Sequence, residues 1–147
     1  MEEITVNAPA KINLSLDVTG KREDGYHNLE TIMQSISLHD RVTVRKCESG
    51  LSIECDFPGM PRGSGNLAWK AAEAFFAEYQ GKGGARIVLE KRIPVSAGLA
   101  GGSTDAAGVL KALNRLYNEP FSEVRLVEIA RKIGADVTFC LRGGTVL

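Results

Sequence analysis

PVSAGLAGGSTDAA, at residues 94–107, is the stretch that decides how the rest of the chain is interpreted. It holds three glycines within five residues and then three polar side chains: Gly98, Gly101, Gly102, Ser103, Thr104 and Asp105. The preceding segment ARIVLEK, at 85–91, predicts a strand, and the run that follows from residue 106 predicts a helix. The expected order is therefore strand, glycine-rich loop, helix.

A glycine-rich loop before a helix is one way to build an anion site from backbone. Because glycine has no Cβ, such a loop can adopt positive φ angles and bring N–H groups close to a ligand. The first N–H groups of a helix lack intrahelical partners and stabilise a phosphate. The stretch is neither a Walker loop, since no Gly-Lys-Ser/Thr follows, nor a dinucleotide fingerprint. These residues alone leave two alternatives, a phosphate site or a plain loop in which Ser103 or Thr104 caps the helix.

The composition is that of one globular domain without a polyanionic partner. The 147 residues are 44% hydrophobic, and 18 Lys+Arg balance 18 Asp+Glu. Zero net charge argues against nucleic acid or an acidic membrane as a partner, and the apolar runs are too short to predict a transmembrane helix. The acidic start MEEITVNAPA is unlike a secretory signal, so we expect a cytoplasmic protein.

Cysteine and histidine are too few and too scattered to predict a metal cluster. The three cysteines, Cys47, Cys55 and Cys140, include no CxxC pair, and the only histidines are His27 and His39. In a cytoplasmic protein we expect free, buried or half-buried thiols, although Cys47 and Cys55 flank an expected hairpin.

Period-2 patterns dominate the first third of the chain. Residues 10–20 alternate and predict a strand that places Lys11 and Asn13 on one polar face. Segments 29–38 and 41–47 also predict strands, and 51–57 is expected to return as the hairpin partner of 41–47.

Helical periodicity dominates later. It predicts helices over residues 66–80, 103–117 and 122–133, with Ser122 as an N-cap and Gly134 beyond the last helix. Residues 135–147 predict a strand, a turn and the start of another strand, so we expect the chain to be part of a longer protein. Strands early and helices late indicate an α+β, two-layer domain, a mixed or antiparallel sheet with helices on one side.

Three segments together resemble the small-molecule kinase superfamily of galactokinase, homoserine kinase, mevalonate kinase and phosphomevalonate kinase. They are APAKIN at 8–13, the glycine-rich stretch at 94–107, and GADV at 134–137. Within that superfamily, PAKINL at 9–14, REDGYH at 22–27 and GADV are similar to the branch that acts on a cytidine diphosphate adduct of methylerythritol. The resemblance covers nearly all of the chain.

The resemblance implies an ATP- and Mg²⁺-dependent kinase that phosphorylates the 2-hydroxyl of that small molecule. Residues 1–147 would be its ATP-binding N-terminal domain, with a fold like that of ribosomal protein S5 domain 2. A C-terminal domain would follow, and the chain alone would have little or no activity. The implied partner is the small-molecule substrate, with no nucleic acid and no membrane.

The resemblance also implies roles for individual residues. Lys11 and Asp136 would be catalytic, and Asn13, Tyr26 and His27 would bind the substrate, with Tyr26 stacking on the cytosine. The residues implied to bind ATP and its phosphates are Pro94, Gly98, Leu99, Gly101, Gly102, Ser103, Thr104 and Asn66. Ser103 and Asp105 are candidates for holding the metal ion.

Without the resemblance, each of these residues has a plainer interpretation. Lys11 is then a solvated strand lysine, and Asp136 an exposed loop acid just past a helix C-terminus. Tyr26 anchors its loop to the core, and Asp105 is an acid in the first turn of a helix. Thr138 replaces a proline that usually follows GADV in these kinases, which is expected to loosen the segment that carries Asp136.

Two other functions remain open at this point. One is another alcohol kinase of the same superfamily, of the homoserine or mevalonate type, whose substrates have no base for Tyr26 and His27 to bind. The other is a non-catalytic binding module, because the same α+β layout occurs in nucleic-acid-binding domains.

Overall fold

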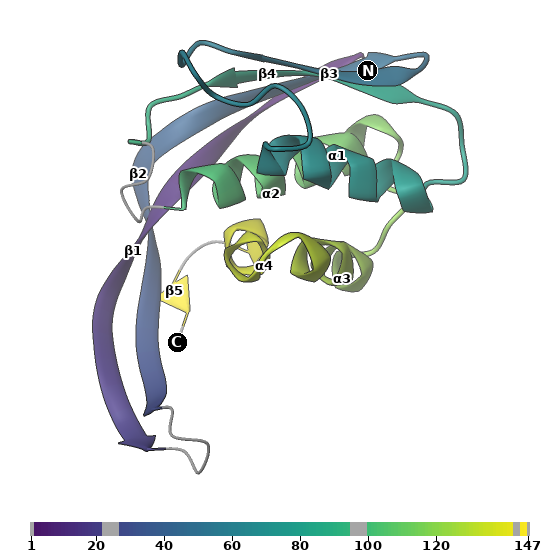
Figure 1. Cartoon of the computed structure of the whole chain (residues 1–147). Coiled ribbons are helices and arrows are strands. Elements are labelled where there is room, and N and C mark those ends of the chain that lie inside the picture. The colour runs from purple at the N-terminus through teal and green to yellow at the C-terminus, as the bar shows by residue number, and fades with distance from the viewer. Residues whose placement is uncertain (1, 22–26, 95–99, 143–144, 147) are drawn as a thin grey trace.

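In the part of the chain that the structure describes, four helices lie on one face of a mixed β-sheet (Figure 1). The computed structural model describes residues 2–21, 27–94, 100–142 and 145–146. Helices α1 (Leu67–Glu78) and α2 (Gly101–Leu116) pack on the sheet. Helices α3 (Glu123–Ile133) and α4 (Ala135–Arg142) pack mainly on α1 and α2 and form a second tier. The α+β class and the placement of helices on one side are confirmed.

The sheet has the strand order β1-β2-β4-β3, and the short β5 also pairs with β2. The strands are β1 (Glu3–Lys21), β2 (His27–Cys47), β3 (Gly50–Cys55), β4 (Gly84–Glu90) and β5 (Thr145–Val146). β1 begins earlier than its alternating pattern predicts, and the two segments expected at 29–38 and 41–47 form one continuous strand. β1 and β2 extend together beyond the helices as a long antiparallel arm (Figure 1).

The expected hairpin between 41–47 and 51–57 is wrong. β3 pairs in parallel with β4, and β4 lies between β2 and β3. The connection from β3 to β4 runs through α1, which is the usual way to join parallel neighbours. Val42, Val44, Ile87 and Leu89 are all buried and explain why β4 takes the central place beside β2.

The three helices that the 3.6-residue period predicts are confirmed to within two residues at each end. The Asn66 side chain caps α1 by accepting a hydrogen bond from Ala68 N, and Ser122 caps α3 by accepting one from Arg125 N. Gly134 ends α3.

The strand expected from residue 135 is wrong, because Ala135–Arg142 is the helix α4. Val137, Phe139 and Leu141 alternate as they would in a strand, but Val137, Cys140 and Leu141 also fit one helical face, and all are buried. A short apolar run cannot be assigned from periodicity alone, and here packing on α2 decides.

Tyr117, just after α2, ties the helices to the sheet. Its hydroxyl donates to Gly84 O at 2.8 Å and accepts from Gly84 N at 3.1 Å. We expect Tyr117→Phe to lower the free energy of unfolding by about 2 kcal/mol, because these backbone groups lose a buried partner. Urea denaturation measures this loss. Tyr79→Phe is the control, since the structure gives its hydroxyl no hydrogen bond within the described residues; an equal effect of both variants would contradict the prediction.

Candidate functional site

Lys11 of β1 and Asp136 of α4 are far apart in sequence, but their side chains face each other in the structure. Lys11 Nζ lies 4.0 Å from Asp136 Oδ2, and the two side chains are 9% and 46% exposed. The pairing of β1 with β2 shifts register between Pro9 and Lys11 and again between Asn13 and Ser15. Such bulges re-aim side chains and are frequent beside active sites. Lys11 is therefore a buried cation aimed at a half-exposed carboxylate, not a solvated strand lysine.

Asp136 lies in the first turn of α4 and not in a loop past the end of α3. The start of a helix favours a negative charge, because its free N–H groups and dipole are positive there. The interpretation of Asp136 as a loop acid just past a helix C-terminus is therefore wrong. The start of α4 and Lys11 therefore both lie beside this carboxyl group.

The start of α2 keeps its backbone N–H groups free of side-chain caps. The residue before the helix, Ala100, has φ 60° and ψ 35° and makes no side-chain hydrogen bond to it. The first helical hydrogen bond runs from Thr104 N to Ala100 O at 2.8 Å. The preceding N–H groups of Gly101, Gly102 and Ser103 are therefore not used by the helix. The prediction that Ser103 or Thr104 caps the helix is wrong. At this helix start the positive φ lies on Ala100 and not on Gly101 or Gly102.

Gly101 is closely packed. A Cβ at this position would lie 3.3 Å from both Lys91 Nζ and Ile93 Cγ2. A side chain there would require these two neighbours to shift by a few tenths of an ångström. Gly102 has more space, since its added Cβ would lie 3.6 Å from Leu67 Cδ1.

The starts of α2 and α4 lie on the same side of the molecule. The Thr104 hydroxyl in the first turn of α2 hydrogen-bonds with the Cys140 thiol of α4, and Cys140 also feels the charges of Asp136 and Lys11. Figure 1 shows α4 beside the N-terminal half of α2. Burial raises the pKa of Cys140 to about 11, so this thiol stays protonated. The acid–lysine pair and the glycine-rich helix start thus border one region.

Two of the other predicted residues, Asn66 and Asp105, have structural partners. Asn66 is buried, with Oδ1 accepting from Ala68 N at 2.9 Å and Nδ2 donating to Pro61 O at 3.0 Å. Asp105 is buried against Lys91, whose Nζ lies 2.7 Å from its Oδ2. This placement does not fit Asp105 as a metal ligand. Thr138 lies within α4, and its buried hydroxyl has no hydrogen-bond partner in the described part of the chain.

The remaining predicted residues are only partly covered by the structure. Pro94 is exposed at the end of the segment that follows β4. The backbones of Asn13 and His27 pair with Met33 and Lys21. Tyr26, Gly98 and Leu99 lie outside the described residues.

Sequence reasoning missed Asp40 and Lys91, which form a buried ion pair beside the start of α2. The sequence carries a signal for this pair, because Asp40 lies two and four residues before Val42 and Val44 and therefore points to the same, inward side of the strand. A charge at an inward position of a strand predicts a buried partner.

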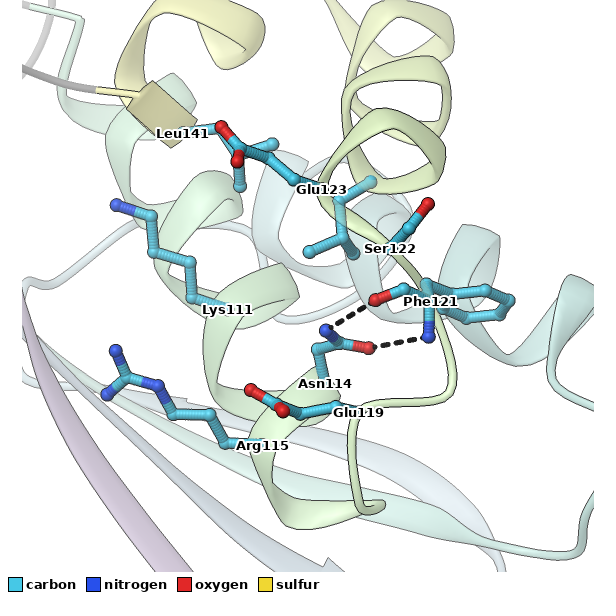
Figure 2. A pocket seen from close by; sticks show the side chains of 9 residues that line it. Lys111, Asn114, Arg115, Glu119, Phe121, Ser122, Glu123 and Leu141 are labelled. Atoms are coloured by element: carbon cyan, nitrogen blue, oxygen red, sulfur yellow. Dashed lines mark hydrogen bonds between the residues drawn. The ribbon is translucent and has the colours of Figure 1, made fainter.

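A hollow of about 720 Å³ lies at the other end of α2, beside the start of α3 (Figure 2). Asn114 is hydrogen-bonded there to both backbone groups of Phe121. Lys111 and Arg115 extend from the same helix (Figure 2). Arg115 lies roughly 20 Å along α2 from Gly101, so this part of the hollow is far from the glycine-rich start of the helix.

Among residues 2–21, 27–94, 100–142 and 145–146, no three histidine, cysteine, aspartate or glutamate side chains come together in a way that could hold a metal ion. Over the same residues, none of the helices combines the length and the apolar character that crossing a membrane requires.

Comparison with known proteins identifies a family. Residues 66–144 match the family model for the GHMP kinases N terminal domain. The chain is 54% identical over 147 residues to a 4-diphosphocytidyl-2-C-methyl-D-erythritol kinase of Acetivibrio thermocellus, covering 100% of the chain and 52% of that protein. It is 52% identical over 144 residues to a kinase of the same name from Clostridium botulinum, covering 98% and 51%. The chain thus spans about half the length of the curated relatives it matches.

Comparison with solved structures finds a kinase of the same kind as the curated relatives. A crystal structure of 4-(cytidine 5'-diphospho)-2C-methyl-D-erythritol kinase superimposes with a TM-score of 0.84 at 46% identity, covering 97% of this chain and 50% of that one. Homoserine kinase from Cytophaga hutchinsonii superimposes with a TM-score of 0.78 at 22% identity, covering 100% and 48%. The second match shows a shared fold alone.

Proposed function

Because the chain belongs to the GHMP kinase family, we propose that it is the ATP-binding part of an ATP-dependent kinase for the 2-hydroxyl of 4-diphosphocytidyl-2-C-methyl-D-erythritol. The observation that carries the proposal is the Lys11–Asp136 pair beside the start of α2. A base for an alcohol and an anion site for a triphosphate are the two requirements of this reaction.

In this proposal Asp136 accepts the proton of the substrate hydroxyl while the hydroxyl oxygen attacks the terminal phosphorus of ATP. The bond from that phosphorus to the oxygen bridging the β- and γ-phosphates breaks, and ADP leaves. A half-exposed carboxylate in the first turn of a helix is accessible to a substrate, as a general base must be. Lys11 holds the carboxylate in place and stabilises negative charge as it develops on the transferring group. Its own burial limits its movement.

The phosphates of ATP would bind at the start of α2. The N–H groups of Gly101, Gly102 and Ser103 are free of helical partners there, and the helix dipole attracts an anion. Pro94, Gly98, Leu99 and Thr104 belong to the same proposed site. Asn66 would act by holding the start of α1 through its cap.

Mg²⁺ fits this arrangement without a cage of protein carboxylates. The ion usually keeps several waters and binds substrate phosphates with one or two protein groups. Ser103, half-buried at the start of α2, is the side chain that would help to hold it, and Asp105 is not. The chemistry that Mg²⁺ supplies when bound is neutralisation of phosphate charge.

We propose that Asn13, Tyr26 and His27 determine which substrate the protein binds. Tyr26 would stack on the cytosine, His27 would hydrogen-bond to its edge, and Asn13 would hydrogen-bond to the substrate from β1. The curated relatives above 50% identity support this substrate over homoserine or mevalonate. We also place the protein in the cytoplasm, where its three free cysteines would stay reduced.

We expect Tyr26→Ala to raise KM for the cytidine substrate about tenfold with little change in kcat, because base stacking contributes about 1–3 kcal/mol to binding. Steady-state kinetics with varied substrate measure this split. KM for ATP serves as the internal control. An unchanged KM for the cytidine substrate would remove Tyr26 from the substrate site.

The direct test is phosphorylation of the cytidine substrate, with homoserine and mevalonate as competitors. Two proteins are compared in this test. One is the chain alone, and the other is the chain joined to a second half that brings it to the full length of its relatives. We expect transfer with the joined protein, and weak nucleotide binding with little or no transfer with the chain alone. Phosphorylation of another alcohol in preference to the cytidine substrate would overturn the proposal.

A further inference from the structure

A buried contact joins the two helices that carry the proposed chemistry (Figure 1). The Thr104 hydroxyl of α2 hydrogen-bonds with the Cys140 thiol of α4, and these two residues are 1% and 5% exposed. Cys140 also lies near enough to Asp136 and Lys11 to interact with their charges. Because both partners are closed to bulk water, the Thr104–Cys140 contact is a fixed link between α2 and α4 and not a surface that a substrate reaches.

Thr104 has no free hydrogen-bond donor to offer to a bound phosphate. Its N–H makes the first helical hydrogen bond of α2, to Ala100 O at 2.8 Å. Its hydroxyl is buried and bonded with Cys140. The N–H groups that the helix leaves unused belong to residues 101–103 instead. Thr104 therefore belongs to the proposed phosphate site through the position that it gives to the helix.

The contact lies about one helical turn from the proposed chemistry on each helix. Gly101, the first residue of α2, lies about 4.5 Å along the helix axis from Thr104. Asp136 lies about 6 Å along α4 from Cys140, and residues at this spacing share one face of a helix. A displacement at the contact therefore moves the phosphate site and the carboxylate relative to each other.

We propose that Thr104 and Cys140 are positioning residues that set the distance between the phosphate site at the start of α2 and the Asp136 carboxylate. Lys11 restrains this carboxylate from the side of the sheet, and the Thr104–Cys140 contact restrains α4 from the side of α2. Transfer requires the substrate oxygen to lie in line with the terminal phosphorus, and a misplacement of about 1 Å can lower the rate about 10²-fold. The inference rests on the proposed function, since it needs ATP at α2 and a hydroxyl at Asp136.

The test compares single-turnover phosphoryl transfer with ATP affinity in the chain joined to its second half. Thr104→Val keeps the branched shape of the side chain and removes its hydroxyl. We expect its transfer rate to fall about tenfold. Its Kd for ATP should stay within about twofold of the wild-type value, because the unused N–H groups at the helix start are unchanged. Thr104→Ser keeps the hydroxyl, so its transfer rate should stay within about twofold of the wild-type rate.

A double-mutant cycle tests whether the two residues act as one link. Cys140→Ala removes the other partner of the contact and should also lower the transfer rate about tenfold. The double variant of Thr104→Val with Cys140→Ala should be no more than about twofold slower than the slower single variant, because each change removes the same contact. Rate losses that multiply in the double variant would overturn the proposal. If urea denaturation shows that Thr104→Val is unfolded, wild-type transfer by Cys140→Ala alone would overturn it.

Thr138→Val is the matched control, because it makes the same change within α4 at a buried hydroxyl for which the described residues supply no hydrogen-bond partner. Its transfer rate should match that of the wild type, and an equal loss in both valine variants would overturn the proposal. A raised Kd for ATP with unchanged transfer in Thr104→Val would make its hydroxyl a phosphate ligand. That result would overturn the positioning role and leave the proposed function intact, whereas absence of transfer by the wild type would overturn both.

Discussion

We expect kcat to fall about a thousandfold when Asp136 is replaced by asparagine in the catalytically complete protein. The amide keeps the size and the place of the side chain in the first turn of α4 but cannot accept the hydroxyl proton. A positioned general base contributes typically 10²–10⁴-fold to the rate. ATP affinity should change by less than about threefold, because the phosphate site at the start of α2 is built from backbone groups.

Pre-steady-state phosphoryl transfer and ATP titration measure the two effects separately. Glu123→Gln is the matched control, because Glu123 is also an acid in the first turn of a helix but lies in α3, where the structure gives it no contact with Lys11. Near-normal transfer by Asp136→Asn would remove Asp136 as the base. An equal loss in Glu123→Gln would point to helix stability as the cause.

Local patterns predicted those parts of the site that depend on a single element. Alternation predicted the strand that carries Lys11, and the helical period located α1, α2 and α3 closely. The order strand, glycine-rich segment, helix is confirmed by β4 and α2. These features follow from backbone geometry within one segment, so one sequence is sufficient to predict them.

The failures have a common cause, which is competition between segments that are distant in sequence. The turn at 48–50 favours a local hairpin, but β4 pairs with β2 instead, because its alternating apolar residues complete the core. Residues 135–142 carry both a period-2 and a helical pattern, and contact with α2 selects the helix. The distance from Lys11 to Asp136 depends on both outcomes, so the residues alone could not predict it.

The sequence contains half of the information needed to predict the ion pair of Asp40 and Lys91. Position 40 faces inward by the alternation of β2, and an inward carboxylate needs a cation or a set of N–H donors. Asp40 has both, from Lys91, Arg92 and Ile93. Its partners come from a segment 51 residues further on, which explains why local reasoning does not supply them.

Lys91→Met should lower the free energy of unfolding of the chain by about 4 kcal/mol, the largest loss in stability that we predict. The variant leaves the fully buried Asp40 carboxylate without its cation, and a broken buried pair costs about 3–5 kcal/mol. Without Lys91 the folded-state pKa of Asp40 should rise above its unfolded value. A raised carboxyl pKa lowers stability as pH increases above the unfolded value, so the loss should be larger at pH 8 than at pH 5.

Removing the unpaired charge of Asp40 should restore much of the lost free energy of unfolding. The double variant Asp40→Asn with Lys91→Met is neutral when Asp105 holds its proton, and its amide oxygen can still accept from Arg92 N and Ile93 N. We therefore expect it to be about 2 kcal/mol more stable than Lys91→Met alone, a non-additivity typical of side chains in one network. Chemical denaturation at pH 5 and pH 8 measures all three proteins, with the exposed Lys70→Met as the control. If the double variant were less stable than Lys91→Met at both pH values, the loss would come from packing of the lysine stem, because charge would then have no part in it.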